Sequence, residues 1–150
     1  MRTHHYMGID PGASGGLALI SSDGILVEKM PATPADLWLL VSSWSELADF
    51  CYIEKVHSMP GQGVSSTFKF GRNFGLIIGC VTAARIPHDF VPPGVWQKNL
   101  GCLTKGDKNV TKQKAQQLYP NMIVTHAIAD AILIAEYCRP VRCNGCPAGF

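Results

Sequence analysis

Three acidic residues stand in apolar surroundings, where a carboxylate normally needs a partner. Asp10 closes an apolar strand pattern over 6–9, and Glu54 lies near the end of another strand pattern. Asp130 belongs to a helical pattern otherwise rich in Ala, Ile and Leu. Burying a polar group without partners costs about 2–7 kcal/mol. These acids are therefore most easily explained as ligands of a cation.

The chemistry expected from such carboxylates depends on whether the fold brings them together. Held close, they repel one another and raise one another's pKa values. A divalent cation such as Mg²⁺ reverses that effect, because it binds oxygen ligands, retains waters and pairs with phosphate oxygens. Two ions about 4 Å apart can position a water, polarise a phosphodiester and stabilise the leaving oxygen. The acids therefore predict phosphodiester hydrolysis by a two-metal mechanism.

Each candidate also has a plainer interpretation that the sequence leaves open. His126 lies one helical turn before Asp130, so the two share a helix face that can cover a sheet edge. Taken alone, His126 is also typical of a surface position. Asp10 precedes Pro-Gly, as many turn residues do, and Glu54 at a strand end is compatible with a position facing solvent.

The rest of the chain predicts the elements that must position these residues. Thr33, Pro34 and Asp36 have the types and spacing of a capped helix start, and the last helix is expected from Thr125 to just before Pro140. Strands are expected over 6–9, 16–20, 25–30, 50–56 and 88–91, and further helices over 65–84, 94–100 and 109–119. This order is typical of an α/β domain with a mixed sheet.

The long helix expected over 65–84 carries Gly71, Gly75 and Gly79, one per turn on one face. Each costs about 1 kcal/mol relative to alanine in a helix. A row of glycines indicates close approach by another backbone. Two interpretations stay open: tight packing on the protein's own sheet, or a subunit interface.

Length and composition limit the class of protein. A chain of 150 residues is one domain of ordinary size, and with 47% hydrophobic and 16% charged residues it can bury a core. The net charge is only +2, but one basic segment is suited to bind a polyanion. Against the single acid Asp107, this segment contains Lys98, Lys105, Lys108, Lys112 and Lys114.

The sequence also carries expectations about compartment. The residues before the first strand lack the apolar segment of a secretory signal. The longest apolar run, 75–84, is far shorter than the roughly 20 residues of a membrane span. We therefore expect a cytoplasmic protein with no membrane partner and with reduced cysteines.

The six cysteines fall into two groups. Three in apolar contexts are expected to be small core residues: Cys51, Cys80 and Cys102. The other three, Cys138, Cys143 and Cys146, form a C-x₄-C-x₂-C pattern near the C-terminus. A structural zinc site usually has four ligands, and no fourth one stands nearby. We therefore expect a loosely packed tail over 138–150 rather than a zinc site.

Five segments occur in the order that characterises a known family. They are GIDPG at 8–12, IEKVH at 53–57, SSTFKFGRNFG at 65–75, the lysine-rich 112–115, and HAIADA at 126–131. Together they resemble the RuvC-type Holliday junction resolvases of the ribonuclease H-like superfamily, in particular the compact versions of phages and prophages. The resemblance implies a nuclease domain over 4–137 with a mixed five-stranded sheet and helices on both faces. It also implies a homodimer that nicks four-way DNA junctions, or forks, with Mg²⁺ or Mn²⁺ in a bacterial or phage-infected cell.

The resemblance also assigns roles to the acids. Asp10, Glu54 and Asp130 match the catalytic residues that bind the metal ions. Cellular members of the family have a further acid three residues before the last one, where this chain has Ala127. His126 is the nearest candidate to fill that gap, as a nitrogen ligand or a general acid.

Further residues are candidates for DNA contact. His57 matches a family position that often carries a base-contacting aromatic residue, and Gln62 lies in a glycine-containing loop that can reach the branch point. Lys112 or Lys114 is expected near the scissile phosphate, although a solvated helix face would also explain both. The remaining phosphate contacts are expected from Lys69, Arg72, Lys98, Lys105, Lys108 and Lys114.

Two other functions compete with an endonuclease. The sequence DPGASGG at 10–16 is similar to the phosphate loop of actin-like kinases and ATPases, but those folds need two lobes and a much longer chain. A non-catalytic junction-binding protein of the same fold is the second alternative, and Ala127 is the residue that favours it.

Overall fold

The computed structural model describes residues 2–57 and 59–143, with side chains through residue 140. A five-stranded sheet in the order β3-β2-β1-β4-β5 forms the middle layer. Its strands are β1 (Tyr6–Asp10), β2 (Gly16–Ile20), β3 (Ile25–Lys29), β4 (Phe50–Glu54) and β5 (His88–Val91). The helices are α1 (Pro34–Trp44), α2 (Val64–Ala83), α3 (Pro93–Asn99), α4 (Asn109–Leu118) and α5 (His126–Cys143). The expected α/β class with a mixed sheet is confirmed.

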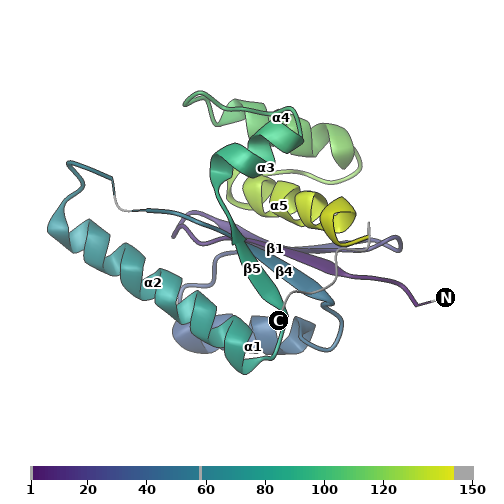
Figure 1. The fold of residues 1–150 in the computed structure, drawn as a ribbon, viewed down its shortest axis with the longest axis horizontal. Helices are drawn as coiled ribbons and strands as arrows, with labels where there is room; N and C mark the ends of the chain where they lie inside the picture. The colour runs from purple at the N-terminus through teal and green to yellow at the C-terminus, as the bar shows by residue number, and fades with distance from the viewer. Residues whose placement is uncertain (1, 58, 144–150) are drawn as a thin grey trace.

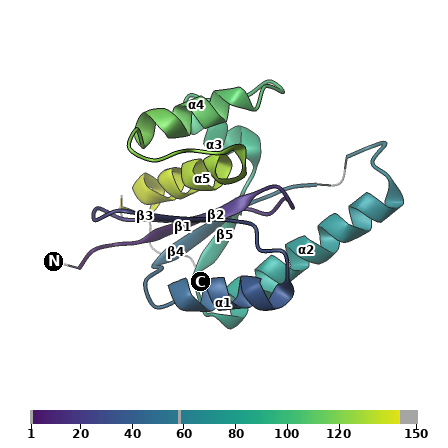
Figure 2. The ribbon, with the colours of Figure 1, turned by 180° about the vertical axis from the view of Figure 1, so that it is seen from behind.

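Helices cover both faces of the sheet, as expected. Helix α5 lies directly on one face, and α3 and α4 pack over it (Figure 1). Helices α1 and α2 cover the opposite face, and the N-terminal part of α2 extends beyond the sheet (Figure 2). Each face has its own apolar core, one around the buried residues of α5 and the other around those of α1 and α2.

The sheet topology places two of the three acids side by side. Strands β1, β2 and β3 are antiparallel neighbours, whereas β1, β4 and β5 run parallel. Ile9 is paired with Ile53, so the next residue on each strand, Asp10 or Glu54, leaves the sheet at the same edge. The parallel pairing of β1 with β4 therefore brings together two residues that are 44 positions apart in the sequence.

Contact between α5 and β1 is unusually close. A Cβ atom added at Gly8 would lie 2.3 Å from both the Ala131 carbonyl oxygen and the Ala135 backbone nitrogen. Only glycine on the strand, facing the small side chains of Ala131 and Ala135, permits this approach. Asp130 immediately precedes Ala131, so the same contact determines how far the third acid lies from the sheet.

The start of α1 forms as its sequence predicts. Thr33 occupies the N-cap, and its Oγ1 accepts a hydrogen bond from the Asp36 backbone nitrogen at 3.1 Å. In return, the Thr33 hydroxyl lies 2.6 Å from Asp36 Oδ2, and Pro34 takes the first helical position. This capped start fixes the direction of the chain as it leaves β3.

Two sequence-based expectations need correction. Helix α5 does not end before Pro140 but continues to Cys143, with Pro140 inside its last turn. Cys138, where the loose tail was expected to begin, is fully buried in the α5 core. The side chain of Cys143, and Cys146 altogether, fall outside the described residues, so the cysteine pattern as a whole stays untested.

The glycine row on α2 does not pack on the protein's own sheet. At Gly71, Gly75 and Gly79, an added Cβ would meet no atom within 4 Å. All three residues are exposed. Of the two interpretations left open by the sequence, tight packing on the sheet is therefore wrong. Separately, none of the described helices combines the length and apolar character needed to cross a membrane.

The contact between α5 and β1 gives a direct test of the fold. We expect Gly8→Ala to destabilise the protein by about 3 kcal/mol, because the added methyl group overlaps two backbone atoms that move only with the whole helix. Urea unfolding of the purified variant measures this loss. The matched control is Gly94→Ala, an open position in α3, for which we expect no loss of stability and a gain of at most about 1 kcal/mol from the higher helix propensity of alanine. Equal stability of the two variants would contradict the packing described.

Candidate active site

The three predicted acids and His126 meet in one cavity at the edge of the sheet where β1 and β4 end. Its volume is about 410 Å³. It is lined by Asp10, Gly12, Ala13, Ser14, Gly15, Glu54, Lys108, Thr111, His126 and Asp130. The loop from β1 to β2, the end of β4, the first turn of α4 and the start of α5 each contribute residues. The expected convergence of Asp10, Glu54 and Asp130 is therefore present in the fold.

Asp10 is held by the loop that follows it. The Gly12 backbone N–H donates to Asp10 Oδ1 at 3.2 Å. Gly15 leaves room for the carboxylate, since a Cβ there would lie 2.7 Å from Asp10 Cγ. Burial raises the pKa of Asp10 to about 6, the Gly12 N–H opposes this rise, and the charge of Asp130 adds to it. Asp10 is therefore more than a turn residue.

Glu54 is enclosed rather than facing solvent. Its side chain accepts a hydrogen bond from Trp96 Nε1, with 2.8 Å between nitrogen and Oε2. Trp96 has no exposed surface and Glu54 is only 8% exposed. Burial and the charge of Asp10 together raise the pKa of Glu54 to about 7, against the lowering effect of the Trp96 hydrogen bond. The indole thus occupies one oxygen of the carboxylate.

Asp130 reaches the cavity from α5. Burial raises its pKa, while a hydrogen bond from the Thr111 side chain and the positive charges of Lys108 and His126 lower it. Thr111 is itself buried in the first turn of α4. Asp10 and Glu54 therefore each accept a hydrogen bond from an uncharged group, a backbone N–H or an indole N–H. The Thr111 hydroxyl beside Asp130 also lies 3.3 Å from the Lys108 carbonyl oxygen.

The donor set of this cavity suits a hard divalent cation. Three carboxylates share it, and their mutual repulsion adds to the cost of burial. Within residues 2–57 and 59–143, no three His, Cys, Asp or Glu side chains are grouped so that they could hold one ion together. Mg²⁺ is commonly bound through one or two carboxylates, with waters and substrate phosphates completing its shell. The carboxylate oxygens of this cavity therefore match the ligand type of such an ion.

Ala127 and His126 lie differently with respect to the cavity. Ala127 does not line the cavity, whereas His126 does. The Ala127 carbonyl lies against β2, where a Cβ at Gly16 would come within 2.8 Å of its oxygen. His126 is the first residue of α5 and is exposed. It lines the cavity from the solvent side, and its role as a ligand or acid stays a prediction.

Of the candidate lysines, Lys108 lines the cavity, and Lys112 and Lys114 do not. The helical repeat explains this difference, because Lys108 and Thr111 are three positions apart and share a face of α4. Lys112 is the next residue along and lies beside that face. Lys114 is close enough to Cys102 to lower the pKa of that thiol, which burial raises. Contact of Lys112 or Lys114 with a scissile phosphate stays a prediction.

The other candidates for DNA contact lie outside the cavity and are exposed. They are His57, Gln62, Lys69, Arg72, Lys98 and Lys105. Gln62 is partly engaged within its own loop, since its Oε1 accepts from the Met59 backbone nitrogen at 3.3 Å. Lys105 lies in the loop before α4 with a positive φ of 47°.

The sequence interpretation missed Trp96 and Thr111. Both act through an acid: Trp96 holds Glu54, and Thr111 holds Asp130. A tryptophan in a short helix and a threonine among lysines carry no local signal of such a role. Only the packing of α3 and α4 against α5 brings them to the acids.

Comparison with known proteins supports this fold. No model of a protein family matches the chain, and no curated protein sequence matches it. Among solved structures, the chain is similar to Thermus thermophilus RuvC in complex with a Holliday junction substrate, with a TM-score of 0.69 and 16% identity over 95% of this chain and 96% of that one. A second structure of Thermus thermophilus RuvC matches with a TM-score of 0.64 and 16% identity over 92% of this chain and 95% of that one. The chain therefore has a RuvC-like fold.

The raised pKa values predict how stability depends on pH in the absence of metal. Folding raises the pKa of Asp10 from 3.8 to about 6 and that of Glu54 from 4.5 to about 7. The folded state binds these protons more tightly, so their contribution to stability is complete below pH 4 and is lost as pH rises through 6 and 7. We expect Glu54→Gln to be more stable than the native protein at pH 8, by about 1–3 kcal/mol.

Urea unfolding in EDTA between pH 4 and pH 8 measures this effect. Glutamine keeps an oxygen for the Trp96 N–H, so the substitution removes mainly the charge. The control is Glu46→Gln, an exposed position outside the cavity. The control should follow the pH dependence of the native protein. If the free energy of unfolding of Glu54→Gln and of the native protein changed with pH in the same way, the raised pKa of Glu54 would be contradicted.

Proposed function

We propose that this chain is a metal-dependent endonuclease that cleaves phosphodiester bonds in branched DNA and thereby resolves four-way junctions. One observation carries the proposal: Asp10, Glu54 and Asp130 line a single cavity at the sheet edge of a RuvC-like fold. A similar solved structure is described as RuvC bound to a Holliday junction. The lysines around the cavity agree with a polyanionic substrate.

The acids would hold Mg²⁺, or Mn²⁺, in pairs that include Asp10, and His126 is the candidate for an additional ligand. Bound there, such ions polarise a phosphodiester and lower the pKa of a coordinated water. The chain's own contribution is to orient the acids. The Gly12 N–H, Trp96 and Thr111 each hold one carboxylate, which leaves other oxygens free to face the cavity.

Lys108 supplies positive charge inside the cavity. It lowers the pKa of both Asp10 and Asp130, so it is close enough to act on either carboxylate. A phosphate bound between the acids would therefore meet an ammonium group on the α4 side. The exposed lysines beyond the cavity would orient the arms of the junction through their phosphates, without reading sequence.

We further propose that the protein acts as a homodimer paired through α2. The open face of this helix carries Val64, Phe68 and the three glycines, with Val64 88% and Phe68 72% exposed. These residues follow the helical repeat and form one uncharged stripe. A second copy packed along it would bury the exposed apolar groups, and the glycines would allow the two backbones to approach closely.

A non-catalytic junction-binding protein is the second candidate function. It is favoured by Ala127 in place of the fourth acid and by the lack of a three-ligand group among the described residues. Such a protein would keep the fold and the basic surface but would bind junctions without cutting them.

The decisive experiment uses a synthetic four-way junction and a linear duplex of the same sequence, each incubated with the protein and Mg²⁺. We expect paired nicks in the junction only. Asp10→Asn should lower the nicking rate by a factor of about 1,000 or more and leave junction binding nearly unchanged, because it removes a metal ligand while keeping the shape. The control is Asp89→Asn, an exposed position on β5.

Three outcomes would contradict the proposal in different ways. Undiminished cutting by Asp10→Asn would remove Asp10 from the site. Binding of the junction without nicks, with Mg²⁺ and with Mn²⁺, would favour the non-catalytic alternative. ATP hydrolysis that does not depend on a junction would favour the kinase-like alternative.

Dimerisation is tested by Gly75→Arg. The position is open in the monomer, so the fold should tolerate the side chain and thermal stability should not fall, but the long charged group blocks the stripe. We expect the native protein to sediment as a dimer and Gly75→Arg as a monomer that makes unpaired nicks. The control is Gly94→Arg, which is equally open but lies on α3. A dimeric Gly75→Arg protein, or a monomeric native one, would contradict pairing through α2.

A further inference from the structure

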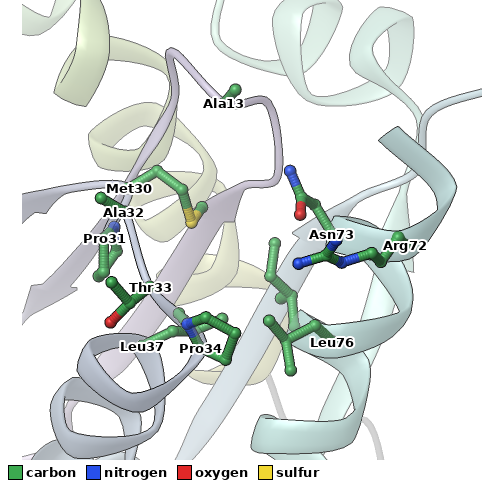
Figure 3. Close-up of a pocket in the computed structure, with 11 residues that line it drawn as sticks. Ala13, Met30, Pro31, Ala32, Thr33, Pro34, Leu37, Arg72, Asn73 and Leu76 are labelled. Carbon is green, nitrogen blue, oxygen red and sulfur yellow. The ribbon is translucent and has the colours of Figure 1, made fainter. Parts of the chain in front are cut away.

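A second cavity adjoins the candidate active site on the α1 and α2 side of the sheet. Its volume is about 230 Å³. It lies between the β1–β2 loop, the 30–33 linker, the start of α1 and the middle of α2 (Figure 3). Ala13 lines both cavities, so the two meet at the tip of the loop that holds Asp10.

The walls of this cavity differ in chemistry. Met30, Leu37 and Leu76 line it with apolar surface. Arg72 and Asn73 extend from α2 toward the space below the loop that carries Ala13 (Figure 3). Within the described part of the chain, neither of these two side chains has a hydrogen-bond or ion-pair partner. The guanidinium of Arg72 and the amide of Asn73 are therefore available to bind a ligand beside the apolar side chains.

We propose that this cavity is a subsite for one unpaired nucleotide of the strand that is cut. The inference rests on the proposed function, because it places the scissile phosphate among Asp10, Glu54 and Asp130. A strand bound there passes the 12–15 loop, so the nucleotide next to the scissile phosphate lies beside Ala13. Ala13 lines the second cavity as well, so a base at that position could enter it.

The chemistry of the walls fits a nucleotide. A guanidinium pairs with a phosphate, an amide can donate to and accept from a base edge, and apolar side chains cover the face of a base. The volume suits one base-sized group and is below the roughly 300–1,000 Å³ of sites for larger ligands. The glycine stripe proposed for dimerisation borders this cavity, because Arg72 and Leu76 are one helical turn from Gly75 and Gly79, whereas Asn73 lies farther round α2.

This subsite would link cutting to the branch point. A base enters a side cavity only after it leaves its stack and its partner, which costs a few kcal/mol in a duplex and least where the base is already unpaired. A four-way junction offers unpaired or easily unpaired bases at its centre. A linear duplex does not, so it would place its phosphate at the acids less often.

The test uses junctions in which one nucleotide flanking the scissile phosphate, on one side or the other, is replaced by an abasic residue. For the native protein, we expect the abasic residue at one of these two positions to slow nicking by about tenfold. That is the size of effect expected when the contacts of one base with the protein are lost. Asn73→Leu keeps the helix and the side-chain size but removes the amide. It should cut the normal junction several-fold more slowly and show a smaller abasic effect than the native protein, because the contact of the amide with the base is already lost.

Ser43→Leu serves as the matched control, because it adds the same side chain at an exposed position of α1 outside both cavities. It should keep the full abasic effect. Circular dichroism and junction affinity of each variant show that the fold and overall binding persist. Equal nicking of normal and abasic junctions by the native protein would overturn the subsite while leaving the proposed function intact. An abasic effect of equal size in Asn73→Leu and Ser43→Leu would also overturn it, whereas failure of the native protein to nick any junction would refute both proposals.

Discussion

The position of α5 on the sheet depends on backbone packed against backbone. At Gly8 on β1 and Gly16 on β2, an added Cβ would come within 2.3 Å and 2.8 Å, respectively, of a carbonyl oxygen of α5. A side chain at either glycine would force the helix away from the sheet, and Asp130 is the residue just before one of the contact points. The geometry of the acids is thus built into the core, where it does not depend on loops alone.

Electrostatics explain why the same arrangement favours a cation. Burial raises the pKa of all three acids, and in two of them a neighbouring carboxylate raises it further. Trp96, Thr111 and the Gly12 N–H lower these pKa values by single hydrogen bonds, and Lys108 adds one positive charge. One ammonium beside three carboxylates leaves negative charge in excess once the acids ionise. A divalent cation, which pairs with phosphate oxygens, would offset that excess.

The features that could be predicted from sequence are those determined by residues close together in the chain. The apolar strand patterns predicted that Asp10 and Glu54 lie at strand ends, and the spacing of Thr33 and Asp36 predicted the start of α1. The remaining features depend on contacts between residues that are far apart in the chain. Lys108 rather than Lys112 reaches the acids because of how α4 rotates against α5, and Trp96 reaches Glu54 only when α3 docks. The glycines of α2 predicted close approach by another backbone, but no atom of the described residues comes within 4 Å of a Cβ added at any of them, so a partner for this face stays a prediction.

Helix α2 carries residues of both the proposed dimer contact and the proposed nucleotide subsite. Phe74 packs toward β5, with its ring centroid 5.9 Å from that of Phe90, so one side of the helix is fixed to the sheet. A second side carries Asn73 into the cavity beside Ala13, and a third, which borders Arg72 and Leu76, presents the glycine stripe. All three sides belong to one rigid helix. Packing of two copies along the stripe would therefore fix the position of the proposed nucleotide cavity of one copy relative to that of the other. Symmetric cutting of two strands requires such a fixed relation between two active sites, and a helix buried along one side provides it better than a loop.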